Sequence, residues 1–299
     1  MPLPAAHNRL LISAPFRVLP PPLIIVGMHR SGTSLVAGML TILGVYLDPA
    51  MMPPAEGERL SIPDEQLRQD GYGEAQDFRL LNERLLARAS ASWDYVEPFL
   101  QRRDRPTFAR LSLARMQLAT FGSLRSSFLR PLPPDYRGPW GWKDPRTSLT
   151  LPYWLRLFPE ARILHVRRNP ENVVNSLQRR AHAWAETSLA PPSFGARLQR
   201  ALLHPDVALH YLGRRLGLVS SAASARPSLL DRDYCLRLCQ QYVEECARFR
   251  AYGDRYLEVQ FEEIIQDPAT LAANLAQFAG ITPSSTRMQQ AIDFVCRKP

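Results

Sequence analysis

The stretch Leu23-Ile-Ile-Val-Gly-Met-His-Arg-Ser-Gly-Thr-Ser34 decides the fold of this chain. Its first four residues are consecutive apolar side chains, which predict a buried parallel strand. A short loop bounded by Gly27 and Gly32 follows, and the apolar run Leu35–Leu43 behind it predicts a buried helix. A strand, a glycine loop and a helix in this order form the first part of a βαβ unit.

The loop has the spacing of a phosphate-binding loop. Gly27-x4-Gly32-Thr33-Ser34 matches the pattern Gly-x4-Gly-Lys-Ser/Thr, except that Thr33 stands where nucleotide-hydrolysing loops have lysine. Backbone N–H groups and the N-terminus of the following helix favour an anion here. The cation inside the loop is Arg30, whose guanidinium can bind two phosphate or sulfate oxygens. The missing lysine argues against ATP or GTP as a phosphoryl donor.

A second junction lies at His165-Val-Arg-Arg168-Asn-Pro-Glu-Asn-Val-Val-Asn-Ser176. The apolar run ending at Val166 predicts a strand, and Pro170 suits the first turn of a helix. Arg168 then leaves the end of the strand, and Ser176 lies about two turns into the helix. At the carboxyl edge of a parallel sheet, this pair can hold a second phosphate.

With both motifs present, the chain resembles the sulfotransferases that use 3′-phosphoadenosine 5′-phosphosulfate (PAPS). The resemblance is to a bacterial branch related to glycan and tyrosyl-protein sulfotransferases. It implies that the first loop grips the 5′-phosphosulfate and that the arginine–serine pair grips the 3′-phosphate. The implied nucleotide-binding residues are Gly27, His29, Arg30, Ser31, Gly32, Thr33, Ser34, Arg168 and Ser176.

Three further segments carry the resemblance: Gly71-Tyr-Gly-Glu74, Trp142-Lys-Asp-Pro-Arg146 and Glu262-Glu-Ile-Ile-Gln-Asp-Pro268. It runs from about Leu23 to Ile281 and leaves residues 186–230 unmatched. Gly73 replaces the usual aromatic residue, which could loosen the loop that aims Glu74.

Sulfuryl transfer to an alcohol needs a base for the acceptor proton and positive groups for the leaving phosphate oxygen. We expect Glu74 to be the base, and Arg30 and Lys143 to stabilise the leaving group. Each has a simpler alternative: Glu74 as a helix-start acid, and Lys143 with Asp144 as a surface pair. Arg146 could contact phosphate or substrate, or could pair with Asp144. This scheme needs no metal.

Two other functions remain open. An atypical P-loop kinase using ATP would need a lysine at position 33 and an acidic magnesium ligand at a strand end. A non-catalytic nucleotide-binding relative would show damage at Arg30, Arg168 or Ser176, and all three are intact.

Composition sets wider bounds. The 299 residues carry a net charge of +9 without a run of five basic residues, which favours an anionic small ligand over nucleic acid. No apolar run reaches eighteen residues, so we expect no transmembrane helix and a cytoplasmic protein. The cysteines lack zinc-ligand spacing and are expected to be core residues in a reducing compartment; they are Cys235, Cys239, Cys246 and Cys296.

The expected architecture is α/β, a P-loop-like parallel sheet flanked by helices on both faces, as in the sulfotransferase fold. Residues 1–22 are predicted to be an irregular N-terminal tail and residues 23–299 a single domain. Residues 186–230 are predicted to be a helical insertion or lid. The expected partners are PAPS, its product 3′,5′-adenosine bisphosphate (PAP), and an acceptor. A glycan or glycolipid is the first choice, and a small-molecule hydroxyl or an amine stays open, as does the oligomeric state.

Overall fold

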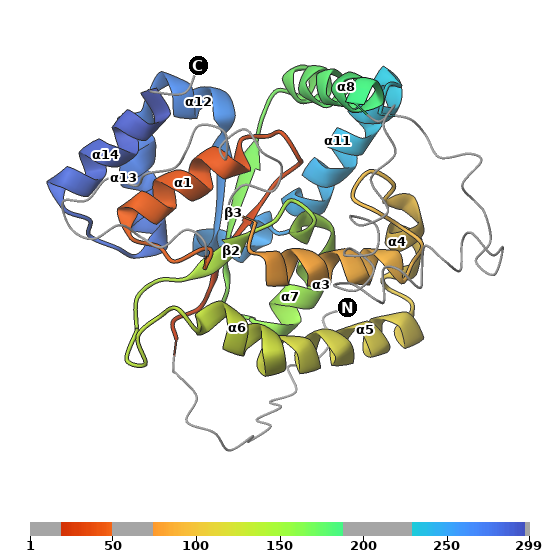
Figure 1. The fold of residues 1–299 in the computed structure, drawn as a ribbon, viewed down its shortest axis with the longest axis horizontal. Helices are drawn as coiled ribbons and strands as arrows, with labels where there is room; N and C mark the ends of the chain where they lie inside the picture. Colours follow the sequence, from red (N-terminus) through yellow and green to blue (C-terminus); the bar gives the residue numbers. More distant parts are fainter. Residues whose placement is uncertain (1–18, 50–73, 188–228, 297–299) are drawn as a thin grey trace.

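A computed structural model describes residues 19–49, 74–187 and 229–296 of the chain (Figure 1). Residues 71–73 and most of the predicted tail and insertion lie outside these ranges. The strands are β1 (Leu23–Val26), β2 (Gly141–Lys143), β3 (Arg162–Arg167) and β4 (Tyr256–Gln260). The helices of the first half are α1 (Thr33–Leu43), α3 (Gln76–Ala87), α4 (Glu97–Arg102), α5 (Pro106–Ala119), η1 (Thr120–Leu124) and α6 (Arg125–Leu129). Those of the second half are α7 (Thr147–Leu157), α8 (Pro170–Thr187), α11 (Arg232–Ala247), η3 (Arg250–Arg255), α12 (Phe261–Gln266), α13 (Pro268–Ala279) and α14 (Ser285–Cys296).

The described strands form one parallel sheet in the order β2-β1-β3-β4. Every residue of β1 is buried, as its continuous apolar run predicts for a strand covered on both faces. Because all the strands run the same way, the loops that follow them gather at one carboxyl edge. The parallel α/β architecture expected from the sequence is confirmed.

Helices cover both faces of this sheet (Figure 1). One face packs against α1, α13 and α14, and its core includes Ile25, Leu164 and Val166. The other packs against α3, α7, α8 and α11, and its core includes Ile24 and Ile163. Neighbouring strand residues point to opposite faces, so each strand contributes to both cores.

The polypeptide before β1 lies against the sheet. The Pro22 carbonyl accepts a hydrogen bond from the backbone N–H of Arg162 at 2.9 Å. The Pro20 carbonyl accepts one from Trp140 Nε1 at 2.7 Å. These contacts join residues 19–22 to the amino edge of the sheet, opposite the phosphate loop.

Helix α7 starts earlier than its sequence pattern predicts. The pattern predicts a short helix over Pro152–Phe158, but α7 begins at Thr147 and contains Pro152 inside it. The start is fixed instead by Asp144, whose side chain accepts from the backbone N–H of Arg146 at 3.0 Å. Its carbonyl accepts from the N–H of Thr147 at 2.9 Å. The helix therefore opens directly behind a buried carboxylate.

Candidate active site at the carboxyl edge of the sheet

The phosphate loop has the backbone that its glycines predict. Gly32 has a φ of 98°, and a Cβ there would lie 2.2 Å from the ring of Phe261. A Cβ on Gly27 would lie 2.4 Å from the Val166 carbonyl oxygen. Glycine is therefore required at both positions for steric reasons. Arg30 also has a positive φ, 69°, which is costly for a residue with a side chain and recurs at functional sites.

The two predicted phosphate motifs contact each other. Arg30 Nε donates to Ser176 Oγ at 3.0 Å, and an Arg168 terminal nitrogen donates to the Arg30 carbonyl at 3.1 Å. The Arg168 guanidinium also lies over the Phe261 ring, 4.4 Å from its centroid. These hydrogen bonds end on neutral oxygens, so the guanidinium charges are not balanced by them. Arg30 is 146 positions from Ser176 and 138 positions from Arg168 in the chain, yet the fold brings these residues together in one cationic patch.

Helix α8 adds two further arginines to this patch. Burial lowers the pKa of Arg30, and the positive charge of Arg179 lowers it further. Burial likewise lowers the pKa of Arg180 to about 10, and Arg30 adds to this effect. Mutual repulsion among these groups would be relieved by a bound anion. The sequence motifs did not single out Arg179 and Arg180, although they lie one turn beyond Ser176 on the same helix.

Two buried polar atoms strengthen the case for an anion. Among the described residues, Ser31 Oγ and Arg168 Nε are shielded from solvent and have no hydrogen-bond partner. Leaving such atoms unpaired costs free energy, so natural proteins usually supply a partner. Both lie beside the phosphate loop, where phosphate oxygens would accept their hydrogen bonds.

Lys143 links the phosphate loop to the predicted base. It stands at the carboxyl end of β2, and its Nζ lies 3.3 Å from Ser34 Oγ and 3.2 Å from Glu74 Oε1. Its side chain is only 1% exposed and that of Glu74 only 6%. The interpretation of Lys143 and Asp144 as a surface pair is therefore wrong.

Arg146 holds the other oxygen of Glu74. One of its terminal nitrogens lies 3.2 Å from Glu74 Oε2 and 2.9 Å from Asp144 Oδ1, and the other lies 3.1 Å from Glu83 Oε1. Of the two roles left open for Arg146, the structure shows the pairing with Asp144. The cluster formed by Glu74, Lys143, Asp144 and Arg146 is called the ion cage below.

Asn82 anchors this ion cage from α3. Its side-chain nitrogen donates to Asp144 Oδ2 at 2.7 Å, and its oxygen accepts from Thr150 Oγ1 at 2.7 Å and Trp154 Nε1 at 2.9 Å. Asn82 and Asp144 are fully buried, so each bond replaces one that water would have made. The network fixes Asp144, which fixes Arg146, which in turn orients Glu74.

The ion cage keeps Glu74 ionised. Burial by itself would raise the pKa of this carboxyl group, but the positive charges of Lys143 and Arg146 lower it to about 2. Burial raises the pKa of Asp144, an effect that Arg146 and the Asn82 amide oppose. At neutral pH Glu74 is thus a carboxylate, the ionisation state that a proton acceptor requires.

His29 turns toward aromatic side chains. Its ring centroid lies 4.4 Å from that of Trp93 and 6.4 Å from that of Tyr242. Burial lowers its pKa well below the usual value, followed by the positive charge of Arg146. Its Nε2 is buried without a partner among the described residues. His29 is thus a neutral, aromatic-lined group near the ion cage.

A comparison with protein families identifies the family of this chain. Residues 21–214, well over half of the chain, match the family described as the sulfotransferase family. The chain therefore belongs to the sulfotransferase family. A search of curated proteins gave no match.

The solved structures that match this chain have low sequence identity and modest TM-scores. Sulfotransferase STF9 from Mycobacterium avium is 18% identical, with a TM-score of 0.45 over 93% of this chain and 68% of that one. Sulfotransferase STF1 from Mycobacterium tuberculosis H37Rv is 13% identical, with a TM-score of 0.42 over 93% and 72%. The sulfotransferase domain of the Synechococcus PCC 7002 olefin synthase is 15% identical, with a TM-score of 0.41 over 95% and 86%.

Within the described residues, no helix combines the length and apolar character needed to cross a membrane. Nor do three or more histidine, cysteine, aspartate or glutamate side chains gather there as a metal site would require.

Proposed function

We propose that this protein transfers a sulfuryl group from PAPS to an acceptor hydroxyl. The observation that carries the proposal is Lys143, whose Nζ lies within 3.3 Å of both the phosphate loop and the Glu74 carboxylate. One buried cation therefore connects an anion-binding loop to a candidate base. Membership of the sulfotransferase family supports sulfuryl transfer as the reaction.

The donor would lie along the carboxyl edge of the sheet. The N–H groups of Arg30 and of residues 32–34, at the start of α1, would bind the 5′-phosphosulfate together with Ser31 Oγ. Arg168 and Ser176 would bind the 3′-phosphate, with Arg179 and Arg180 supplying further positive charge. The donor brings about four negative charges, which suits a patch where several guanidinium groups gather.

In the proposed step, Glu74 takes the acceptor hydroxyl proton while the acceptor oxygen bonds to the sulfur atom. The bond between sulfur and the bridging oxygen of the 5′-phosphate breaks, and that oxygen keeps the electron pair in PAP. Lys143 and Arg30 stabilise the charge growing on this oxygen. Asp144 and Arg146 act as positioning residues, since they reach the reaction only through Glu74.

Weakening the contact between Lys143 and Glu74 would also make Glu74 a stronger base. With a pKa of about 2, Glu74 attracts a proton weakly. A donor phosphate competing for Lys143 Nζ would draw positive charge away from the carboxylate and raise its pKa. Donor binding would thus prepare the base as well as the leaving group.

The acceptor is proposed to be a carbohydrate or glycolipid. His29 and Trp93 offer partly exposed aromatic surface close to Glu74, and such surface suits the apolar face of a sugar ring. The free, buried Cys235, Cys239 and Cys246 support a reducing compartment such as the cytoplasm.

Thermal unfolding with two ligands tests the donor. PAP should raise the melting temperature by mass action, because it binds only the folded state. ATP with magnesium should raise it less, since position 33 lacks the lysine that reaches the outer phosphates of ATP. Stabilisation by ATP–magnesium and not by PAP would replace the proposal with the kinase alternative.

A further inference from the structure

Helix α5 carries apolar side chains on its outer face as well as its inner face. Met116 is buried in the core, whereas Leu111 is 51% exposed and Leu118 is 79% exposed. These leucines are seven residues apart and therefore lie on one side of the helix, two turns from each other. Large apolar side chains that gather in an exposed strip often mark a surface that meets an apolar partner. With Phe121, they make up three of the five large hydrophobic side chains exposed in the described residues.

Arginines flank this apolar strip. Ala114 lies between the two leucines, and Arg110 and Arg115 lie on either side of the strip, all three exposed. The excess of positive charge continues along the neighbouring segment. Between residues 102 and 137 the exposed arginines are Arg102, Arg105, Arg110, Arg115, Arg130 and Arg137. The exposed acids of that segment are Asp104 and Asp135.

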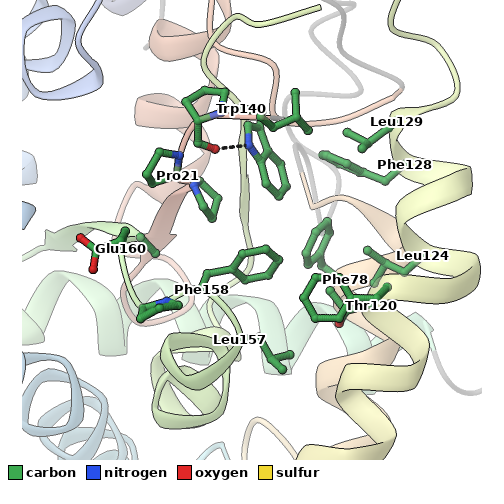
Figure 2. A pocket seen from close by; sticks show the side chains of 16 residues that line it. Pro21, Phe78, Thr120, Leu124, Phe128, Leu129, Trp140, Leu157, Phe158 and Glu160 are labelled. Atoms are coloured by element: carbon green, nitrogen blue, oxygen red, sulfur yellow. Dashed lines mark hydrogen bonds between the residues drawn. The ribbon is translucent and has the colours of Figure 1, made fainter. Parts of the chain in front are cut away.

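An apolar cavity of about 310 Å³ lies at the end of α5 (Figure 2). Its walls include Pro21, Phe78, Leu124, Trp140 and Phe158, with Phe121 from η1. The cavity lies where β1, β2 and β3 begin, at the opposite edge of the sheet from the phosphate loop, so it belongs to neither phosphate motif. Its size falls at the lower end of the range for ligand pockets, and its lining suits hydrocarbon.

We propose that the outer face of α5, with Phe121, docks on an anionic lipid bilayer. Exposed leucines framed by arginines are the pattern of helices that lie in a membrane interface, where the apolar strip enters and the cations meet headgroups. Nucleic acid would use the arginines but leave the leucines in water. A second copy of this face would place arginines against arginines. The apolar cavity beside Phe121 would accommodate part of a lipid acyl chain.

Vesicle co-sedimentation of the full chain tests this proposal. The protein should bind vesicles of phosphatidylglycerol with phosphatidylcholine, bind phosphatidylcholine alone far less, and be released by salt. Replacing Arg110→Glu and Arg115→Glu should lower binding at least ~25-fold, since each arginine near such a surface contributes about fivefold. Replacing Leu111→Ser and Leu118→Ser should lower vesicle binding about tenfold, because two apolar side chains that would enter the bilayer are lost.

The matched control is Leu230→Ser with Ile265→Ser. These side chains are 46% and 50% exposed, as much as Leu111, but lie outside α5. This control should bind vesicles as well as the unmodified protein does. All variants should have the melting temperature of the unmodified protein and the same stabilisation by PAP. Equal loss in the control, or binding to a DNA duplex but not to vesicles, would overturn the proposal. Neither result touches the proposed sulfuryl transfer, because α5 contributes nothing to the ion cage.

Discussion

The ion cage and the arginine patch lie at the same edge of the sheet but treat charge in opposite ways. In the ion cage, each cation faces a carboxylate within about 3 Å. Asn82 holds Asp144 in place by a hydrogen bond from α3. In the patch, Arg30 and Arg168 donate to a hydroxyl and a carbonyl. Burial lowers the pKa of both, and neighbouring arginines lower it further, although Glu262 opposes the effect at Arg168. A neutralised cluster can hold a reactive group in place, whereas a cluster with excess charge is suited to bind an anion. We therefore assign proton transfer to the first region and donor affinity to the second, with Arg30 of the patch also stabilising the leaving oxygen.

The largest expected effect comes from the base. Glu74→Gln removes the proton acceptor but keeps the shape of the side chain, so sulfuryl transfer should fall about 10²- to 10⁴-fold. The rate is measured as PAP release with an acceptor found by screening glycans, lipids and small alcohols.

Glu83→Gln is the matched control for this change. Glu83 also contacts Arg146, at 3.1 Å, but its side chain is 37% exposed. It should change the rate little, because exposed ion pairs contribute weakly. Unchanged turnover in Glu74→Gln would remove Glu74 from the mechanism.

The ion cage should also make the fold sensitive to acid. The pKa of Glu74 is about 2 in the folded protein, against 4.5 for an ordinary glutamate. Its contribution to the free energy of unfolding is therefore complete above pH 4.5 and lost as the pH falls toward 2. That contribution is about 3 kcal/mol. Asp144, whose pKa burial raises, works in the opposite direction.

Urea unfolding at pH 7 and at successively lower pH measures how the free energy of unfolding depends on pH. The curve of Glu74→Gln should be flatter than that of the unmodified protein between pH 4.5 and 2. Parallel curves would mean that Glu74 is not held by Lys143 and Arg146.

The arginine patch should control recognition of the 3′-phosphate. Arg168→Ala should weaken PAP about 10- to 100-fold, because charge-assisted hydrogen bonds to phosphate are strong. The same change should barely affect 5′-AMP, which has no 3′-phosphate. Calorimetric titration with both nucleotides gives the ratio of affinities. An equal loss for the two would place Arg168 at the 5′ end instead.

Ser176 should show the smallest effect. Ser176→Ala removes a hydroxyl that accepts from Arg30 Nε, so PAP affinity should fall about fivefold, the value of one ordinary hydrogen bond. Ser126→Ala, on an exposed hydroxyl of α6, is the control and should change nothing. A loss as large as that of Arg168→Ala would mean that Ser176 organises the patch rather than adding one contact.

The sequence predicted the arginine patch better than the ion cage. The phosphate loop and Arg168 follow apolar strands directly, so local patterns reveal both. Glu74, Lys143 and Arg146 came from the family resemblance, and their mutual contacts could not be foreseen. Asn82 lies 62 residues from Asp144 in the chain, and no local pattern joins them.

Helix α14 and the arginines of α8 differ in how far local patterns reach. The predicted elements do not include α14, although Met288, Ala291, Ile292 and Val295 have helical spacing. Arg179 and Arg180 lie beyond Ser176, where the predicted phosphate motif ends. Long-range packing decides which face of α8 meets the loop, and the sequence does not contain that information in local form.

The most direct test of this division compares PAP binding by Glu74→Gln and Arg168→Ala in the same calorimeter. If the two regions divide the work, Glu74→Gln binds PAP within about threefold of the unmodified protein, while Arg168→Ala loses at least about tenfold. Strong loss in Glu74→Gln with normal binding in Arg168→Ala would contradict the account, because affinity would then reside in the ion cage.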